Sequence, residues 1–297
     1  MLKNKKTKDK TDRKYVNILG INVLSTTTFS LLASVEENIS DNIKFSITTP
    51  NPELVLASTK DPNLKQALNA SAYSVPDGIG LAQAVKFLSM RSFRTPILKE
   101  VVYFIQGLIV GAATLINPKW LTKNFKIIKG RVLFNGLIKL ANEKKWKVFF
   151  LGGENDEAEL AARKLILRYK DIKILSESGP MVDDNADPVS EVDRKLEKDA
   201  VESINKFKPQ LLFVAMKNPK QEIWIYKNLK KLNVGGAMTV GGTFRYISGK
   251  SLLPPKWMGE CGLEWVWRLL TEPFRIKRIV NAAIIFPWAT FLYKLKK

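Results

Sequence analysis

Strands and helices are expected to alternate along most of this chain, and this order restricts the folds open to it. Short apolar runs bounded by glycine or proline predict strands, and amphipathic segments between them predict helices. The expected strands are residues 15–24, 43–48, 147–151, 172–177, 210–216 and 234–240. The clearest expected helices are 27–40, 156–169, 191–207 and 221–232, with another that ends at Lys144. Such alternation is typical of a parallel sheet covered by helices, so we predict an α/β, Rossmann-like fold.

In open sheets of this kind, ligands bind beyond the carboxyl ends of the strands. The loops that follow the expected strands lie around Thr49, Asp77, Gly152, Pro219 and Gly241. Glycine lets the backbone approach a ligand closely, and a backbone N–H can then contact a phosphate. A Gly-Gly pair after a strand is equally often only a tight turn, so both interpretations stay open.

The charge of the chain indicates a polyanionic partner. The 297 residues include 48 Lys and Arg against 28 Asp and Glu, a formal net charge of +20, and 45% hydrophobic residues, which is enough for a real core. Nucleic acid and an anionic membrane surface are the usual partners of such a chain. No nucleic-acid-binding motif is recognisable, and the basic and aromatic segment near the C-terminus adjoins an apolar tail.

Residue usage also limits the chemistry. The chain has no histidine and a single cysteine, Cys261, so an internal disulfide and imidazole catalysis are both excluded. Acid–base work must fall to carboxylates, tyrosine, lysine or that thiol. The first ten residues are polar and charged with no apolar segment behind them, unlike a secretory signal, and we expect the chain to stay in the cytoplasm.

Two uncharged stretches suggest contact with a membrane. The 18 residues 101–118 and the 15 residues 279–293 carry no charge, and basic residues flank the second stretch. Both stretches are short for a membrane crossing, since a helix of intermediate length, 16 residues, spans roughly 24 Å and the hydrocarbon core of a bilayer is about 30 Å thick. One crossing at 101–118 would also separate the Thr49 and Asp77 loops from the later segments. We therefore predict a re-entrant or interface-seated insertion and a C-terminal interfacial anchor. A buried core helix is the alternative for either stretch.

Three arginines, Arg268, Arg275 and Arg278, mark the C-terminal region. On one helix, steps of seven and three residues would bring them within roughly a quarter-turn of each other, a cluster that suits a diphosphate. A solvated basic helix face is the alternative, and Pro273 can divide the segment into two helices. We divide the chain into a disordered basic arm (1–14), an α/β core (15–250) with an apolar insertion (91–129), and a membrane-associating helical appendage (251–297).

Seven short motifs occur along the chain before these arginines. They are Thr-Pro-Asn-Pro-Glu at 49–53, Pro-Asp-Gly-Ile-Gly at 76–80, Phe-Phe-Leu-Gly-Gly at 149–153, Asn-Pro-Lys-Gln-Glu at 218–222, Gly-Gly-Thr-Phe at 241–244, Ser-Gly-Lys at 248–250 and Gly-Leu-Glu-Trp at 262–265. Each is weak alone, but together they resemble the WecG/TagA/CpsF glycosyltransferase family, glycosyltransferase family 26. The resemblance runs from residue 16 to about residue 280, apart from residues 91–129.

The resemblance implies an inverting, metal-independent hexosyltransferase on the cytoplasmic face of the cell membrane, peripheral or monotopic. Members transfer a sugar, often N-acetylmannosamine or its uronic acid, from a UDP donor to a polyprenyl-diphosphate-linked sugar, in the synthesis of cell-surface polysaccharide or teichoic-acid-type polymers. The implied partners are a UDP-sugar, the lipid-linked acceptor and an anionic membrane surface, with a homo-oligomer possible and no nucleic acid. No cofactor is expected besides the UDP-sugar donor substrate.

The matching motifs also assign roles to residues. Asp77 is the expected base that takes the acceptor proton, Thr49 is expected to hydrogen-bond the sugar or phosphate, and Gln221 is expected to orient a substrate through its amide. Asp77 could instead cap the following helix, Thr49 could be an ordinary turn or cap residue, and Gln221 could be an ordinary first-turn residue. The other candidate substrate-binding residues are Asn51, Gly78, Gly152, Gly153, Lys220, Glu222, Gly241, Gly242, Thr243, Arg268, Arg275 and Arg278. The resemblance further implies that the arginines close over the site.

The chain departs from the family pattern at a few positions. Lys217 replaces a usual glycine, Arg245 a usual aspartate, and Leu253-Pro254-Pro255 the usual Arg-Ala-Pro, while the insertion at 91–129 is additional. These departures leave the donor open, with UDP-glucose or a UDP-uronic acid as alternatives. A catalytically inactive membrane-bound scaffold and a nucleic-acid-binding protein are the alternatives from other classes.

Overall fold

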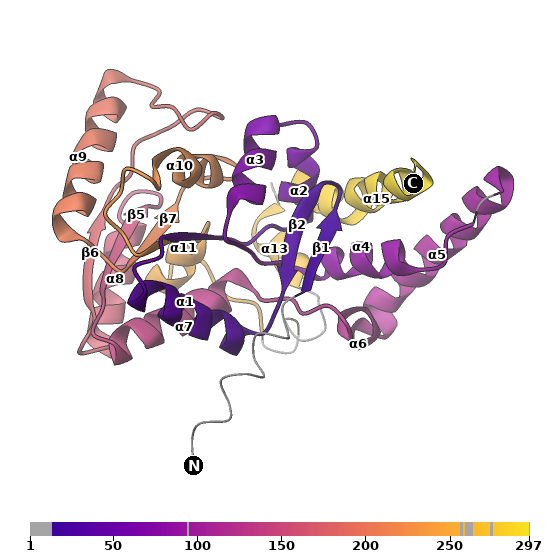
Figure 1. Cartoon of the computed structure of the whole chain (residues 1–297), viewed down its shortest axis with the longest axis horizontal. Helices are drawn as coiled ribbons and strands as arrows, with labels where there is room; N and C mark the ends of the chain where they lie inside the picture. Colours follow the sequence, from indigo (N-terminus) through magenta and orange to yellow (C-terminus); the bar gives the residue numbers. More distant parts are fainter. Residues whose placement is uncertain (1–13, 94, 256–257, 259–263, 274–275, 297) are drawn as a thin grey trace, which may run out of the picture.

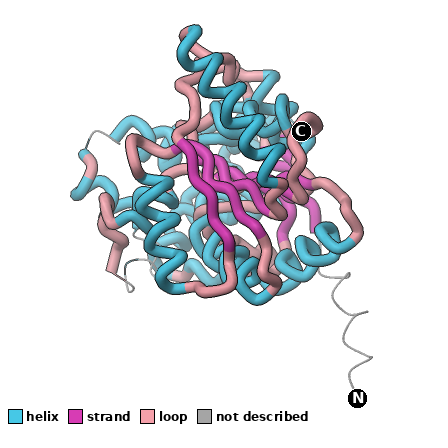
Figure 2. The backbone as a smooth tube through the Cα atoms, turned by 90° about the vertical axis from the view of Figure 1, so that its left-hand side faces the viewer, coloured by secondary structure: helices cyan, strands magenta, loops and turns pink. Residues whose placement is uncertain are grey.

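The computed structural model describes residues 14–93, 95–255, 258, 264–273 and 276–296. The described residues form a parallel six-stranded sheet in the order β4-β3-β8-β7-β5-β6, which confirms the predicted fold class. Figure 2 shows its strands between layers of helices. The strands are β3 (Phe45–Thr48), β4 (Tyr73–Ser74), β5 (Lys147–Gly152), β6 (Lys173–Glu177), β7 (Leu211–Ala215) and β8 (Gly236–Thr239).

Helices cover both faces of the sheet, because successive side chains of each buried strand point to opposite faces. Val148 and Phe150 of β5 belong to one apolar cluster and Phe149 and Leu151 to the other. The first cluster is covered by α1 (Thr28–Ser40), α7 (Gly130–Glu143), α8 (Glu157–Arg168) and α11 (Thr243–Ser248). The second is covered by α2 (Pro52–Ser58), α3 (Pro62–Ala70), α4 (Ile79–Ser89), α9 (Glu191–Phe207) and α10 (Lys220–Asn228).

The segment expected to be one strand at 15–24 is two strands, so that prediction is wrong. β1 (Lys14–Ile18) and β2 (Ile21–Ser25) pair antiparallel outside the main sheet. Leu19 and Gly20 form the turn with positive φ values of 51° and 89°, the geometry that suits a two-residue hairpin. Leu19 is buried, and its apolar side chain continues the strand pattern through the turn and hides it.

The insertion contains a long helix that extends away from the body of the molecule, α5 (Pro96–Ile116), followed by α6 (Pro118–Thr122) (Figure 1). The 21 residues of α5 span roughly 30 Å. The helix is longer than the uncharged stretch because it begins at Pro96 and includes Lys99 and Glu100. Leu98–Ile116 is long and apolar enough to cross a membrane by length and composition, yet only 17% of its most apolar window is buried. This exposure argues against the alternative of a buried core helix.

The C-terminal segment is helical and packs on the insertion. α13 (Glu264–Thr271) comes first, and α14 (Ile276–Val280), a π-helix η3 (Asn281–Ile285) and α15 (Phe286–Lys296) follow one another directly. α15 packs against α2, α4 and α5, and Phe286 is fully buried. The basic arm at 1–14 lies outside the described residues except for Lys14, which begins β1.

Lys294 on α15 is buried, although the sequence placed it in the basic flank of an anchor; that interpretation of Lys294 is wrong. Its Nζ donates hydrogen bonds to the Phe87 and Met90 carbonyl oxygens at 2.6 and 3.1 Å and to Gln106 Oε1 at 2.8 Å. The two carbonyls lie at the C-terminal end of α4, where carbonyl oxygens lack helical partners and attract a cation. Burial lowers the pKa of Lys294 to about 8. Lys294 therefore fastens α15 to α4 and α5.

We expect Lys294→Met to lower the free energy of unfolding by about 1–3 kcal/mol, because it removes the Lys294 donor from the Met90 carbonyl oxygen and Gln106 Oε1 and leaves the Phe87 carbonyl oxygen only its bond from the Met90 N–H. Urea denaturation followed by circular dichroism measures this change. The exposed neighbour Lys296 provides the control, and Lys296→Met should change the value by less than about 0.5 kcal/mol. Equal effects of the two substitutions would contradict the fastening role.

The same variant should alter the pH dependence of stability. The pKa of Lys294 falls from its ordinary 10.5 to about 8 in the folded protein, so the unfolded chain holds more protons between these values. Lys294 should therefore make the free energy of unfolding rise with pH from about 8 to 10.5, and Lys294→Met should lose that part of the rise.

Candidate active site

Three loops meet at the carboxyl ends of β3 and β4. The Val75 N–H donates to the Thr48 carbonyl oxygen at 2.8 Å, and the Asp77 N–H donates to the Pro50 carbonyl oxygen at 2.9 Å. From the far end of the insertion, the Ile128 N–H donates to the Pro76 carbonyl oxygen at 3.1 Å. These backbone bonds bring the Thr49 and Asp77 loops, which the sequence singled out, together with the start of α7.

The Asp77 carboxylate lies at the N-terminus of α7. Its Oδ2 accepts a hydrogen bond of 3.2 Å from the Gly130 N–H, 53 positions along the chain. A Cβ atom on Gly130 would lie 3.1 Å from Thr49 Oγ1 and 3.6 Å from Asp77 Oδ2, so Gly130 leaves space between the two side chains. The positive end of the α7 dipole stabilises negative charge at this point. Thr49 and Asp77, two of the three predicted catalytic residues, therefore face the same glycine.

Gly130 is not among the predicted site residues, because it lies outside all seven motifs, directly after the apolar insertion. The available signal was Lys129-Gly130-Arg131, a glycine between two basic residues directly before the apolar residues of an amphipathic helix. Both basic neighbours are half-buried.

The local conformation also decides between two alternatives for these loops. α4 begins after Gly78, which has a positive φ of 92° and serves as its N-cap with no side-chain cap bond. The alternative in which Asp77 caps the following helix is therefore wrong, since its carboxylate accepts from α7 instead. Asn51 is the N-cap of α2, and its Oδ1 accepts from the Leu54 N–H at 2.9 Å, so this candidate binding residue shapes the Thr49 loop.

Gln221, the third predicted catalytic residue, connects two loops through its amide. Its Oε1 accepts from the Met216 and Gly241 N–H groups at 3.3 and 3.1 Å. Its Nε2 donates to Asn218 Oδ1 at 2.7 Å and Glu222 Oε1 at 2.8 Å. An amide side chain has two donors and two acceptor lone pairs, so all four are used. In this arrangement Gln221 holds the loop after β7 to the loop after β8.

Glu222 supports Gln221 from the interior. It is 2% exposed, and its Oε2 has no hydrogen-bond partner among the described residues. Burial raises the pKa of Glu222 to about 7. A group buried this deeply is placed to hold the Gln221 amide and not to contact a ligand directly.

The glycine turns differ in how open they are. A Cβ on Gly152 would lie 2.4 Å from the Ala215 carbonyl oxygen, which also accepts from the Gly153 N–H at 2.7 Å. This Gly-Gly pair therefore closes β5 against β7, as the tight-turn interpretation expected. The Gly241 N–H is bonded to Gln221, whereas Gly242 is exposed and has open space around it.

Two other candidates are engaged within the protein. The Thr243 hydroxyl is buried and donates to the Val240 carbonyl oxygen at 2.6 Å. Lys220 Nζ donates to the Val182 carbonyl oxygen at 2.5 Å and lies 3.8 Å from Asp184 Oδ1. Both side chains therefore stabilise loops at this edge of the sheet.

The two basic departures from the family pattern face acidic side chains. Lys217 Nζ lies 3.3 Å from Glu154 Oε1, and Arg245 lies 3.8 Å from carboxylate oxygens of both Glu154 and Glu157. The added positive charge is thus balanced locally by the loop after β5.

Of the three arginines, Arg278 is the one whose side chain the structure describes. Its Nε donates to Glu53 Oε2 at 2.7 Å, and Glu53 lies in the first turn of α2, just after the Thr49 loop. Arg268 belongs to α13, but its side chain lies outside the described part of the chain, and Arg275 lies outside it entirely. The C-terminal segment thus reaches the candidate site at Arg278.

We expect Gln221→Leu to lower the free energy of unfolding by about 1–3 kcal/mol, because it leaves the Met216 and Gly241 N–H groups without an acceptor. Urea denaturation provides the measurement. Gln66→Leu, at an exposed position of α3, is the control for replacing an amide and should change the value by less than about 0.5 kcal/mol. Unchanged stability of Gln221→Leu, with lost activity, would show instead that the amide acts on a substrate.

Comparison with known proteins agrees with the motifs. Residues 16–109 and 108–297 match the family described as the glycosyl transferase WecG/TagA/CpsF family. The chain is 28% identical over 247 residues to the N-acetylglucosaminyldiphosphoundecaprenol N-acetyl-beta-D-mannosaminyltransferase of Bacillus subtilis (strain 168), covering 82% of this chain and 78% of that protein. It is 27% identical over 285 residues to a protein of the same name from Staphylococcus aureus (strain NCTC 8325 / PS 47), covering 95% and 92%. The chain belongs to the WecG/TagA/CpsF family of glycosyl transferases.

Proposed function

We propose that this protein is an inverting glycosyltransferase that moves N-acetylmannosamine or a related sugar from a UDP donor to a polyprenyl-diphosphate-linked sugar. The relatives named above carry the acceptor and the transferred sugar in their names. The observation that carries the proposal is the Asp77 carboxylate, held beside Thr49 by the Gly130 N–H at the carboxyl end of the sheet. The product would enter a cell-surface polysaccharide or a teichoic-acid-type polymer.

Asp77 is the base in this proposal. As the acceptor hydroxyl attacks the anomeric carbon, its proton passes to the Asp77 carboxylate while the bond from that carbon to the UDP oxygen breaks. Attack from the face opposite UDP inverts the configuration. Thr49 lies across Gly130 from Asp77, where its hydroxyl can bond the sugar or its phosphate.

Departing UDP develops negative charge on its β-phosphate, which preorganised donors must stabilise. Arg278 is a candidate because it lies next to the Thr49 loop, with Arg268 and Arg275 as further candidates from the family resemblance. A diphosphate would compete with Glu53 for the Arg278 guanidinium. We propose that this exchange lets the C-terminal segment close over a bound donor. The reaction as proposed needs no cofactor besides the UDP-sugar.

We propose that the protein works on the cytoplasmic surface of the membrane, with α5 seated in the interface. Large apolar side chains of α5 are exposed: Leu98, Val101, Phe104, Ile105, Leu108, Ile109, Leu115 and Ile116. A patch of this kind marks a membrane or partner surface, and the formal charge of +20 favours anionic lipid.

A crossing by α5 would conflict with the site. Asp77 precedes the insertion and Gly130 follows it, and the two are hydrogen-bonded. Residues 117–129 would have to cross back, although they include Lys119, Lys123 and Lys126. Such a short basic segment does not span a bilayer. The chain must therefore enter α5 and return from it on the same side of the membrane.

The exact donor is a separate question. UDP-glucose and a UDP-uronic acid remain alternatives, and the pairing of Lys217 and Arg245 with Glu154 gives no special support to an acidic sugar. An inactive scaffold is the second candidate, and the assembled Thr49, Asp77 and Gly130 arrangement speaks against it. A homo-oligomer stays a prediction.

We expect Asp77→Asn to reduce transfer from UDP-N-acetylmannosamine to a GlcNAc-diphosphate lipid by about 10²–10⁴-fold, because the amide is no base although it can still accept from Gly130. Radiolabelled product formation measures the rate. Asp61→Asn, which keeps an N-cap on α3, is the matched control and should retain full activity. Equal rates for Asp77→Asn and the wild type would remove Asp77 from the mechanism.

We also expect Leu115→Asp to weaken binding to vesicles of anionic phospholipid several-fold, because it places a charge on the apolar face of α5. Co-sedimentation with phosphatidylglycerol vesicles measures the bound fraction. Leu167→Asp is the control, since Leu115 and Leu167 are similarly exposed, at 70% and 78%, but Leu167 lies on α8. An equal decrease of the bound fraction in both variants would contradict membrane contact through α5.

A further inference from the structure

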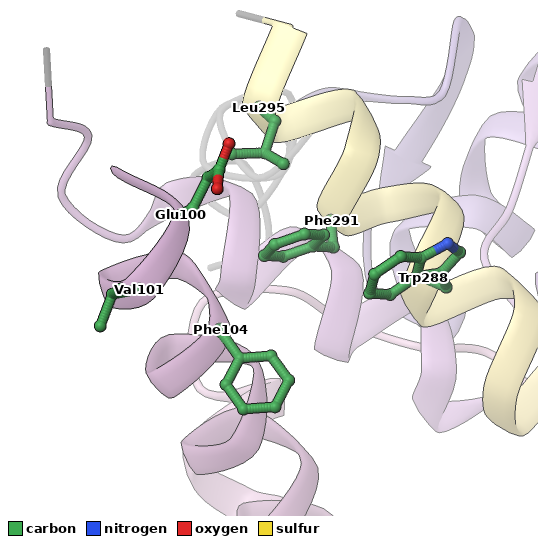
Figure 3. Close-up of a pocket in the computed structure, with 6 residues that line it drawn as sticks. All are labelled: Glu100, Val101, Phe104, Trp288, Phe291 and Leu295. Atoms are coloured by element: carbon green, nitrogen blue, oxygen red, sulfur yellow. The ribbon is translucent and has the colours of Figure 1, made fainter. Parts of the chain in front are cut away.

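An apolar groove lies between α5 and α15. It has a volume of about 370 Å³ and is lined by Glu100, Val101, Phe104, Trp288, Phe291 and Leu295 (Figure 3). Val101, Phe104 and Trp288 are about half exposed. Trp288 and Phe291 stack with their ring centroids 5.2 Å apart. Apart from the Glu100 carboxylate and the Trp288 indole N–H, the lining side chains are hydrocarbon, so the groove suits a mainly apolar ligand.

The walls of the groove are held together from behind. Lys294 bonds Gln106 on α5 and the end of α4, and Lys99 on α5 donates to the Leu295 carbonyl oxygen on α15. Tyr103 is fully buried and its ring lies 4.5 Å from Lys294 Nζ. Because these bonds fix α15 against α5, the groove is a built feature of the fold.

The groove is also connected to the candidate active site. Arg278, which pairs with Glu53 beside the Thr49 loop, lies in α14, and the helical run continues from α14 through η3 into α15. Phe291 follows Arg278 by 13 residues, which corresponds to roughly 20 Å of helix. α2 packs against both η3 and α15 along this path. A lipid-linked acceptor bound beside the Thr49 loop can therefore extend a long apolar tail along α15 into the groove.

We propose that this groove holds the isoprenoid chain of the lipid-linked acceptor, an inference that rests on the proposed function. The chain has no polar groups, which matches the mostly apolar lining, and it belongs to the acceptor whose sugar must reach Asp77 and Thr49 in the proposed reaction. Bilayer acyl chains would instead contact the outer part of α5, where Leu108, Leu115 and Ile116 are exposed but do not line the groove. A protein partner would need several hydrogen-bonding groups around the contact, and the groove offers only Glu100 and the Trp288 indole N–H.

The first test compares two acceptors with the same GlcNAc-diphosphate head, one with an undecaprenyl chain and one with two isoprene units, in detergent micelles. The Val101→Asp/Phe104→Asp double variant should raise KM for the long acceptor by about tenfold and leave KM for the short one unchanged. Val192→Asp/Phe29→Asp is the matched control, because these side chains are 70% and 73% exposed on α9 and α1. An unchanged KM for the long acceptor, or equal increases for both acceptors, would overturn the proposal.

The second test needs no transfer reaction. Undecaprenyl diphosphate with a photoreactive group in its chain should label peptides that contain Val101 and Phe104 or Trp288 to Leu295, and the double variant should lose this label. Labelling elsewhere, or equal labelling of the groove by a photoreactive phosphatidylglycerol, would overturn the proposal. If the wild type labels in the groove but forms no product from either acceptor, the proposed transfer fails and the groove assignment stands.

Discussion

The hydrogen bond from the Gly130 N–H to the Asp77 carboxylate is the constraint on which the rest of the arrangement depends. It joins Asp77, just before α4, to Gly130, just after the insertion, so α4, α5 and α6 must leave the sheet and return to the same point. It also places a carboxylate at the positive end of a helix and next to Thr49. An exposed apolar helix is thereby fixed beside the candidate site, on one side of any membrane that it touches.

The C-terminal segment is fastened at both ends by a basic residue, but the two contacts differ in kind. Lys294 is buried among two carbonyl oxygens and the Gln106 amide oxygen, where three hydrogen bonds offset part of the cost of desolvating its charge. Arg278 forms an ion pair with Glu53 in which both side chains keep some exposure to solvent. Such a pair contributes little stability and is easily exchanged for a phosphate. The first contact therefore anchors the segment, and the second leaves it responsive to a ligand.

The layers of the fold and the loops of the site could be predicted from the sequence. The spacing of apolar residues indicates strands and helices, and glycines after a strand mark its carboxyl end. It failed where a residue's role depends on a distant partner. Leu19 looks like a strand residue until its neighbour Gly20 turns the chain. Gly130 matters only because Asp77 lies beside it, and Lys294 is basic in the sequence whether it faces lipid or the end of α4. The Gln221 amide makes all four of its hydrogen bonds within the protein, and motif spacing could not predict this.

The most direct test of the account is the anomeric configuration of the product formed from α-linked UDP-N-acetylmannosamine and a GlcNAc-diphosphate lipid, read by nuclear magnetic resonance. A single displacement assisted by the Asp77 carboxylate predicts only the β-linked disaccharide. An α-linked product would contradict the account, because it would require either a covalent intermediate or front-face attack, and neither follows from a base held by Gly130 beside Thr49.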